Sequence, residues 1–453
     1  MYGDSYGTFF VQGFAGRHPE LVRSVVLDSA YPTYGESGWY PTQGPAMREA
    51  FTKACRRSVE CRSAGKGFLP TLRAVLHRVR ERPWTGVSHD AEGNRAEVTV
   101  DGAALTSVAF LATYTPAGYR ELTAALRSGL RGYRAPLLRL VAEAVGGSSN
   151  GGPVQGYSEG LDAAVACHDY PQVYDMTSPP GRPRVRQLDR AVTERSRTHP
   201  GTYAPFTVRE YADSDWQMLD WCTHWPVAPA DNPAGPLVPA GGYPDVPVLV
   251  LSGELDSITT PAEGALITKQ FPSARQVIVR NSFHVTAIGD RDDCAERIVR
   301  AFVRSPGSER SRCAQQVEPV RALGMLPRTL ADLAGTGVRR AGPAVALTVA
   351  DVTDRWWNNY SGNGVGLHGG TFTYAGSDVV RLRLDGYRLF RGLAVTGLAT
   401  WDRDRERMQV DLSLNGSLHG HLRGGWDTRA VGADAVLRGV VDGQRVRLTF
   451  PAP

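Results

Sequence analysis

The feature that most constrains the fold of this 453-residue chain is a serine between two glycines, Gly3-Asp4-Ser5-Tyr6-Gly7. The pattern Gly-x-Ser-x-Gly is typical of the sharp turn between a buried strand and a helix that lifts a serine hydroxyl clear of a parallel sheet. Glycines are expected two positions before and after the serine, because a Cβ there would meet the adjacent strand or helix. We therefore interpret Ser5 as a candidate nucleophile for attack on a carbonyl carbon.

Two further segments match the same pattern, and their surroundings distinguish them from the first. Gly147 to Gly151 lies in a run of Gly, Ser and Asn that is typical of a flexible loop. In Gly156 to Gly160, Ser158 precedes an apolar run and is better interpreted as a helix N-cap. Only Ser5 is followed by an apolar helical pattern and then by a β-branched run, residues 21–28, that suits a buried parallel strand.

Length and composition indicate a globular protein of more than one domain. The chain exceeds what one hydrophobic core usually organises, so two or three domains are expected. No apolar run approaches the roughly 18 residues of a membrane span. The net charge of +5 comes almost wholly from arginines that are scattered along the chain. Without a basic stripe and interleaved aromatic residues, this charge argues against nucleic-acid binding.

The cysteines bear on metal binding and on compartment. They lack C-x-x-C spacing and clustered histidines, so no zinc site is expected, and no other cofactor is indicated. Their even number suggests disulfides, which form outside the cytoplasm. No charged and apolar leader precedes the serine motif, so the N-terminus shows no export signal although the cysteines indicate a protein outside the cytoplasm. The six cysteines are Cys55, Cys61, Cys167, Cys222, Cys294 and Cys313.

Two more candidate catalytic residues follow strand patterns late in the chain. Residues 246–253 predict a buried parallel strand followed by a loop with Asp256, and residues 274–280 predict a strand followed by a loop with His284. Catalytic groups of open α/β sheets lie in such loops, and the order Ser, Asp, His suits a nucleophile, an orienting acid and a general base. The alternative interpretations are that Asp256 lies in a surface turn and that His284 has no catalytic role. Glu254 is a rival acid, but it lies nearer the strand end, so Asp256 is preferred.

The pattern of the remaining segments predicts an α/β fold with a helical insertion and an antiparallel β-domain. Helical spacing interrupted by Gly/Pro loops dominates the middle of the chain, and a period of two dominates its end, where Asp442-Gly443 predicts a hairpin turn. The predicted parts are an α/β core in two pieces (1–40 and 236–314), a helical cap (41–235), a linker (315–343) and the β-domain (344–453).

Several of these residues together carry a family resemblance. The sequence resembles the tripeptidyl-aminopeptidase-like branch of the prolyl-aminopeptidase family of serine peptidases. The residues that carry the resemblance are the serine motif, Leu251 to Asp256, His284 to Asp290, and Cys294 with Cys313. The resemblance implies an α/β-hydrolase fold and a secreted enzyme that needs no cofactor. Such an enzyme releases short peptides or single residues from the free N-terminus of a peptide through an acyl-enzyme.

The resemblance also implies a role for individual residues. Ser5 is the expected nucleophile, His284 the general base and Asp256 the orienting acid, while the backbone N–H of Tyr6 is one oxyanion donor. An aminopeptidase must also pair the substrate ammonium with carboxylates of the cap, whereas an esterase with the same triad would not. The unranked candidates are Glu159, Asp169, Asp215 and Asp220. The family has a disulfide at Cys294–Cys313, and we extend the pairing by proximity and exclusion to Cys55–Cys61 and Cys167–Cys222.

The sequence departs from the family pattern at two places. Phe283 stands where the family usually has glycine. The first strands of the sheet and a Gly-rich loop with an oxyanion N–H, expected before the serine motif, are not in the sequence. We therefore expect an N-terminally truncated hydrolase that, as given, turns over substrate barely or not at all. A catalytically dead binding or structural protein is the hypothesis from another class.

Overall fold

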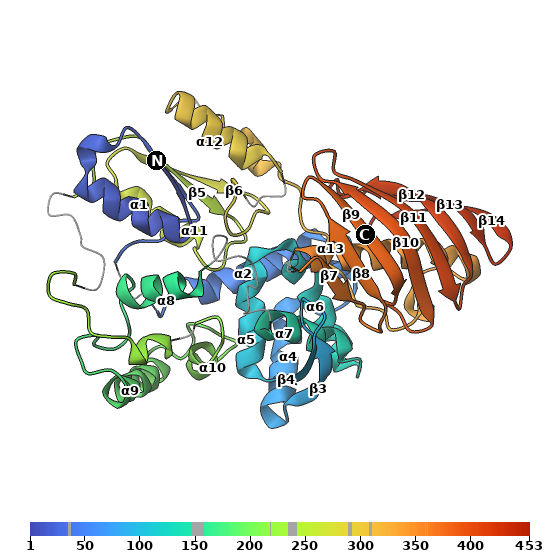
Figure 1. The fold of residues 1–453 in the computed structure, drawn as a ribbon, viewed down its shortest axis with the longest axis horizontal. Coiled ribbons are helices and arrows are strands. Elements are labelled where there is room, and N and C mark those ends of the chain that lie inside the picture. Colours follow the sequence, from blue (N-terminus) through green and yellow to red (C-terminus); the bar gives the residue numbers. More distant parts are fainter. Residues whose placement is uncertain are drawn as a thin grey trace. The chain divides into compact units, whose positions relative to one another are not determined.

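The computed structural model describes residues 1–34, 38–146, 158–217, 219–233, 242–288, 292–307, 310–357, 359 and 361–453. These residues form two compact units, each assembled from separate stretches of the chain (Figure 1). In the described ranges, no helix is both long and apolar enough to cross a membrane. The first unit contains Met1–Ala54, Gly102–Gly118 and Pro153–Val317; the second contains Cys55–Asp101, Tyr119–Gly152 and Glu318–Pro453.

A four-stranded parallel sheet forms the centre of the first unit. Its order is β1-β2-β5-β6, with every neighbouring pair parallel. Both β2 and β5 are buried along their whole length, as their β-branched sequences predict. Because all four strands are parallel, their carboxyl ends lie at one edge of the sheet. The strands are β1 (Tyr2–Asp4), β2 (Val25–Asp28), β5 (Val248–Gly253) and β6 (Ala274–Val279).

Helices cover both faces of this sheet. Successive side chains of a strand point to opposite faces, so Val250 packs in the core with α1 and α11, whereas Leu251 packs in the core with α12. The predicted helix after Ser5 is therefore observed, and a second helix, α11, follows the Asp256 loop. The three helices are α1 (Tyr6–Arg17), α11 (Pro261–Gln270) and α12 (Cys294–Arg304).

The segment between β2 and β5 supplies further helices. Ser158 caps α8, where its hydroxyl accepts a hydrogen bond from the Leu161 N–H at 3.3 Å, so the N-cap interpretation of Ser158 is confirmed. The rival serine of Gly147 to Gly151 lies outside the described residues. The helices are α2 (Gln43–Arg57), α3 (Val59–Ser63), α4 (Phe68–Glu81), α5 (Gly102–Leu111), α6 (Pro116–Leu130), α7 (Ala135–Gly146), α8 (Glu159–His168), α9 (Arg182–Thr198) and α10 (Val208–Ala212).

A β-hairpin interrupts this helical segment. Strands β3 (Trp84–His89) and β4 (Arg95–Val100) pair antiparallel, and Gly93 in the connecting turn has φ +87°. Along β4, Val98 and Val100 are buried while the residue between them is exposed, which is the period-two pattern of a strand. The segment predicted as a helical cap, residues 41–235, therefore also contains a β-hairpin.

An antiparallel sheet of eight strands in chain order dominates the second unit. The predicted antiparallel β-structure is confirmed, and so is the Asp442-Gly443 turn, since both residues have positive φ (47° and 76°) as a type I′ hairpin turn requires. The strands are β7 (Asn363–Val365), β8 (Thr371–Ala375), β9 (Val379–Tyr387), β10 (Leu393–Asp402), β11 (Arg407–Gly416), β12 (Gly420–Asp427), β13 (Asp434–Val441) and β14 (Gln444–Pro451).

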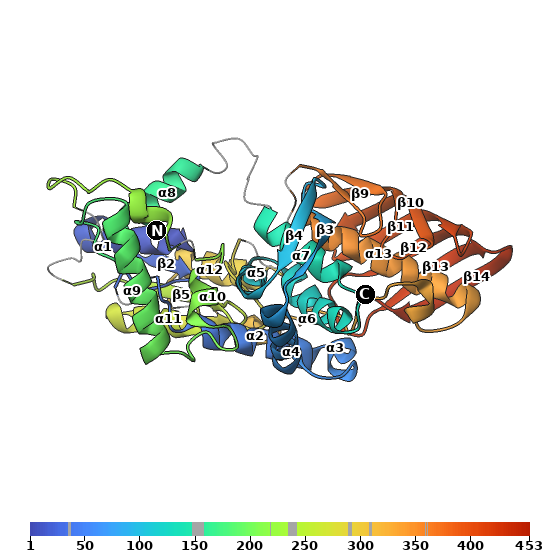
Figure 2. The ribbon, with the colours of Figure 1, turned by 90° about the horizontal axis from the view of Figure 1, so that it is seen from below.

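One face of this sheet is covered by a helix that the sequence pattern did not reveal. Helix α13 (Ala341–Trp356) runs along the sheet (Figure 2) and packs Val345, Val349 and Val352 into its core. Its β-branched residues resemble those of a strand, but their spacing of three and four places them on one side of a helix. The start of the predicted β-domain is therefore helical.

Candidate functional site

The Ser5 turn has the strained geometry expected of a nucleophile turn. Ser5 follows β1 and precedes α1 with φ 46° and ψ −121°, a conformation that non-glycine residues rarely adopt. A Cβ on Gly3 would lie 2.4 Å from the carbonyl oxygen of Gly7, so no side chain fits at Gly3. A Cβ on Gly7 would meet nothing nearer than Asp4 Oδ1 at 3.9 Å among the described residues. The expectation that a Cβ would clash on both sides is thus wrong for Gly7.

The sheet brings the three predicted catalytic residues into contact. His284 Nε2 lies 2.9 Å from Ser5 Oγ, and His284 Nδ1 lies 3.0 Å from Asp256 Oδ2. Asp256 follows β5 and His284 follows β6, so parallel pairing places both loops at the edge that carries Ser5. An imidazole held between a hydroxyl and a carboxylate can accept the hydroxyl proton while the carboxylate stabilises the imidazolium.

Asp256 is held in place by the loop that contains it. Its Oδ1 accepts hydrogen bonds from the N–H groups of Ile258 and Thr259, both at 2.9 Å, and its Oδ2 accepts one from the Thr259 hydroxyl at 2.7 Å. Burial alone would raise the pKa of Asp256, but the charge of His284 and these hydrogen bonds hold it below the usual range. Asp256 is therefore ionised and faces Nδ1 of His284.

The rival acid has other partners. Glu254 Oε1 lies 3.1 Å from the ammonium of Lys53, and Glu254 Oε2 accepts a hydrogen bond from the Asn281 N–H at 3.1 Å. Glu254 thus connects the ends of β5 and β6 through its hydrogen bond with Asn281, while Asp256 contacts the imidazole of His284.

Asp28, at the end of β2, is a site residue that sequence reasoning missed. It is buried, and its Oδ1 accepts hydrogen bonds from the Thr286 N–H (3.0 Å) and hydroxyl (2.9 Å), while its Oδ2 accepts one from the Ala287 N–H at 2.7 Å. Its backbone carbonyl accepts a hydrogen bond from the Ser5 N–H at 3.0 Å. Burial raises the pKa of Asp28, and these hydrogen bonds oppose the rise. Asp28 therefore joins the Ser5 turn to the loop that carries His284.

Ser29 reinforces the same connection. Its hydroxyl accepts a hydrogen bond from the Val285 N–H at 2.8 Å, and Val285 has φ 59°. The position before His284, where the family usually has glycine, holds Phe283 with its side chain buried. The signal that could have identified Asp28 and Ser29 is their place at the carboxyl end of a predicted central strand.

Tyr6 places its backbone N–H in the first turn of α1, where such groups have no partner within the helix. Its hydroxyl donates to Asp169 Oδ2 at 2.7 Å. Of the four candidate carboxylates, Asp169 is thus tied to the residue that follows Ser5. Asp215 and Asp220 are exposed, and the side chain of Glu159 lies outside the described residues.

Three disulfides join all six cysteines, and no free cysteine remains. The pairs are Cys55–Cys61, Cys167–Cys222 and Cys294–Cys313, as the resemblance implied and its extension proposed. This set is consistent with an extracellular protein. Within the part of the chain that the structure describes, no group of three or more His, Cys, Asp or Glu side chains could hold a metal ion.

In a comparison with known proteins, one part of the chain matches a family model. Residues 209–313, which include Asp256 and His284, match the family described as TAP-like protein. No curated protein matches the chain. The chain is similar to a solved structure described as "Est816 as an N-Acyl homoserine lactone degrading enzyme", with 13% identity and a TM-score of 0.20 over 66% of each chain. The chain thus matches just under two thirds of that enzyme's length, and this likeness supports no argument about function.

Proposed function

Residues 209–313 match the TAP-like α/β-hydrolase family, and from this premise we propose that the protein is a serine hydrolase that cleaves peptide bonds near a free N-terminus. The observation that carries the proposal is the contact of His284 Nε2 with Ser5 Oγ at 2.9 Å. In this mechanism His284 removes the Ser5 proton as Oγ attacks the carbonyl carbon, and Asp256 stabilises the imidazolium. His284 then gives the proton to the leaving amine, and water hydrolyses the acyl-enzyme by the reverse sequence.

Tyr6 contributes the second element of the mechanism. Its N–H follows the nucleophile directly, at the start of α1, where it can donate to the oxyanion as negative charge develops. The partial positive charge of the helix N-terminus acts in the same direction.

Asp169 is the carboxylate that we assign to the substrate ammonium. Its side chain is about a third exposed; its Oδ2 accepts a hydrogen bond from the Tyr6 hydroxyl, and its Oδ1 lies 2.9 Å from His168 Nδ1. An ammonium paired with Asp169 would lie on the Tyr6 side of the nucleophile, which would limit cleavage to bonds close to the N-terminus.

A fluorophosphonate probe tests the nucleophile, because it reacts with a serine hydroxyl activated by a base. We expect labelling at Ser5 by peptide mapping, loss of labelling in Ser5→Ala and His284→Ala, and full labelling in the matched control Ser158→Ala. An unlabelled wild-type protein, or labelling that survives Ser5→Ala, would overturn the proposal.

Substrate pairs distinguish a peptidase from an esterase with the same triad. We expect tripeptidyl or aminoacyl anilides with a free amine to react with Ser5 faster than their N-acetylated forms, and Asp169→Asn to remove this difference. Equal reaction of free and acetylated substrates, together with rapid reaction of simple esters, would favour the esterase.

A further inference from the structure

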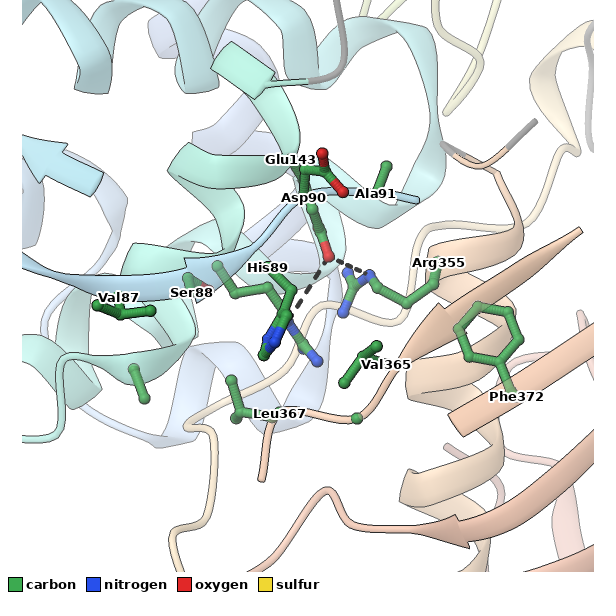
Figure 3. A pocket seen from close by; sticks show the side chains of 13 residues that line it. Val87, Ser88, His89, Asp90, Ala91, Glu143, Arg355, Val365, Leu367 and Phe372 are labelled. Carbon is green, nitrogen blue, oxygen red and sulfur yellow. Dashed lines mark ion pairs between the residues drawn. The ribbon is translucent and has the colours of Figure 1, made fainter. Parts of the chain in front are cut away.

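The second unit contains a cavity of about 90 Å³, drawn in Figure 3. Its walls come from β3 and the turn after it, α7, α13 and the β7–β8 hairpin. This volume is large enough for several water molecules. One wall is apolar (Val365, Leu367 and Phe372), and the opposite wall carries charged side chains.

Two buried arginines form the charged wall. Arg139 donates from Nη1 to Asp351 Oδ2 at 3.0 Å, and Arg355 donates from Nη1 to Asp351 Oδ1 at 3.0 Å. Arg355 also donates from Nη2 to Glu121 Oε2, and the Tyr387 hydroxyl donates to Asp351 Oδ2 at 2.6 Å. Both oxygens of Asp351 are therefore hydrogen-bonded behind the cavity wall.

Glu143 carries the carboxylate oxygen of this cluster that has no hydrogen-bond partner among the described residues; the Nε atoms of Arg139 and Arg355 also have none. The Glu143 side chain is only 5% exposed, and its Oε1 lies 2.9 Å from Arg355 Nε and 3.8 Å from Arg139 Nε, the two ion pairs dashed in Figure 3. Its Oε2 is buried and has no hydrogen-bond partner among the described residues. A buried carboxylate oxygen without a donor is costly, so this atom calls for a donor supplied from the cavity.

The charges of the cluster show which kind of donor fits. Two guanidinium groups face the three carboxylates Asp351, Glu121 and Glu143, which leaves one negative charge in excess; nearby Asp354 is balanced by Arg120 at 2.8 Å. Burial raises the pKa of Glu143 to about 7, because the guanidinium groups offset only part of the desolvation cost. A proton or a cation in the cavity would neutralise the excess charge.

We propose that this cavity binds a small primary ammonium ion with a short alkyl group, which donates hydrogen bonds to Glu143 Oε2. An ammonium supplies both the positive charge and the N–H donors, and its alkyl group would lie against Val365, Leu367 and Phe372. A metal ion fits less well, since no group of three or more His, Cys, Asp or Glu side chains suited to a metal occurs in the described residues.

Calorimetric titration of the full chain at pH 8 with three probes of similar size tests the charge selectivity. We expect ethylammonium to bind at one site, and ethanol and acetate to show no saturable binding. Potassium chloride at equal ionic strength controls for salt. If ethanol binds as well as ethylammonium, or if none of the probes binds and a crystal soaked in ethylammonium shows only water in the cavity, the proposal is wrong.

Variants locate the site. Glu143→Gln keeps the shape but removes the charge, and we expect it to weaken ethylammonium binding at least tenfold. The exposed Glu97→Gln on β4 is the matched control and should bind as the wild type does. If Glu143→Gln does not fold, Ala135→Leu, which fills the cavity without changing its charge, should abolish binding. Unchanged binding in a folded Glu143→Gln, or in Ala135→Leu, would overturn the proposal.

The pH dependence gives an independent readout. Protonated Glu143 cannot accept from an ammonium, so binding should weaken about tenfold between pH 8 and pH 6, given its pKa near 7. His89 lines the same cavity, and its protonation would also oppose a cation, so the series is repeated in His89→Gln. The other charged groups facing Glu143 or lining the cavity are Arg139, Arg355, Asp351, Glu121 and Asp90. Binding that is independent of pH in His89→Gln would exclude Glu143 as the acceptor.

Discussion

Replacing Asp28 by asparagine is expected to slow acylation of Ser5 without changing the triad itself. The new side-chain amide would retain one oxygen, which can still accept from the N–H and hydroxyl of Thr286. Its nitrogen would face the Ala287 N–H, now 2.7 Å from Asp28 Oδ2, so one partly buried donor loses its acceptor. That loss costs about 1–3 kcal/mol, and relaxing it moves the loop that carries His284. The rate should fall roughly 10- to 100-fold.

The assay is the rate of fluorophosphonate labelling of Ser5 at saturating and subsaturating probe. We expect the maximal rate to fall while the half-saturating probe concentration stays the same, because Asp28 acts on the base and not on probe binding. In the His284→Ala background, Asp28→Asn should cause no further loss. The exposed Asp245→Asn in the same unit is the matched control. Wild-type labelling by Asp28→Asn, or an equal loss with and without His284, would refute the positioning role.

Three further predictions concern stability and are measured as free energies of unfolding. The pKa of Glu143 is raised from 4.5 to about 7, so its protonation favours the folded state and the associated stability is lost as pH rises through 7. The free energy of unfolding of Glu143→Gln should therefore rise relative to that of the wild type by up to about 3 kcal/mol between pH 5 and pH 8. A difference that stays constant with pH would contradict this linkage. Replacing Cys167 and Cys222 by serine should lower the free energy of unfolding by up to about 4 kcal/mol, because the disulfide closes a loop of 55 residues and so reduces the entropy of the unfolded chain. An unchanged denaturation midpoint would contradict this argument. Ser5→Gly should be roughly 1 kcal/mol more stable than Ser5→Ala, because only glycine adopts φ 46° and ψ −121° without strain; equal stabilities would mean that the turn is unstrained.

The sequence by itself determined the features that depend on local pattern. The β-branched run of β5 must be buried on both faces, and the glycine before Ser5 is required because a Cβ at Gly3 would meet the next turn of the chain. The Asp442-Gly443 dipeptide determines a hairpin because both residues tolerate positive φ. The family resemblance paired Cys294 with Cys313, and the proximity of Cys55 to Cys61 in the sequence then left Cys167 to pair with Cys222, as the structure has them.

Only the tertiary structure decided the contacts between residues far apart in the chain. Asp28 resembles any acid at a strand end until parallel pairing with β1 and β5 brings it to the loop after His284, more than 250 residues later. The carboxylate of Glu143 resembles one on a solvated helix face until α13 brings Arg355 to 2.9 Å from it and the fold buries it. Such groups carry no local signal, because burial and partners across the fold set their hydrogen bonds and their pKa values.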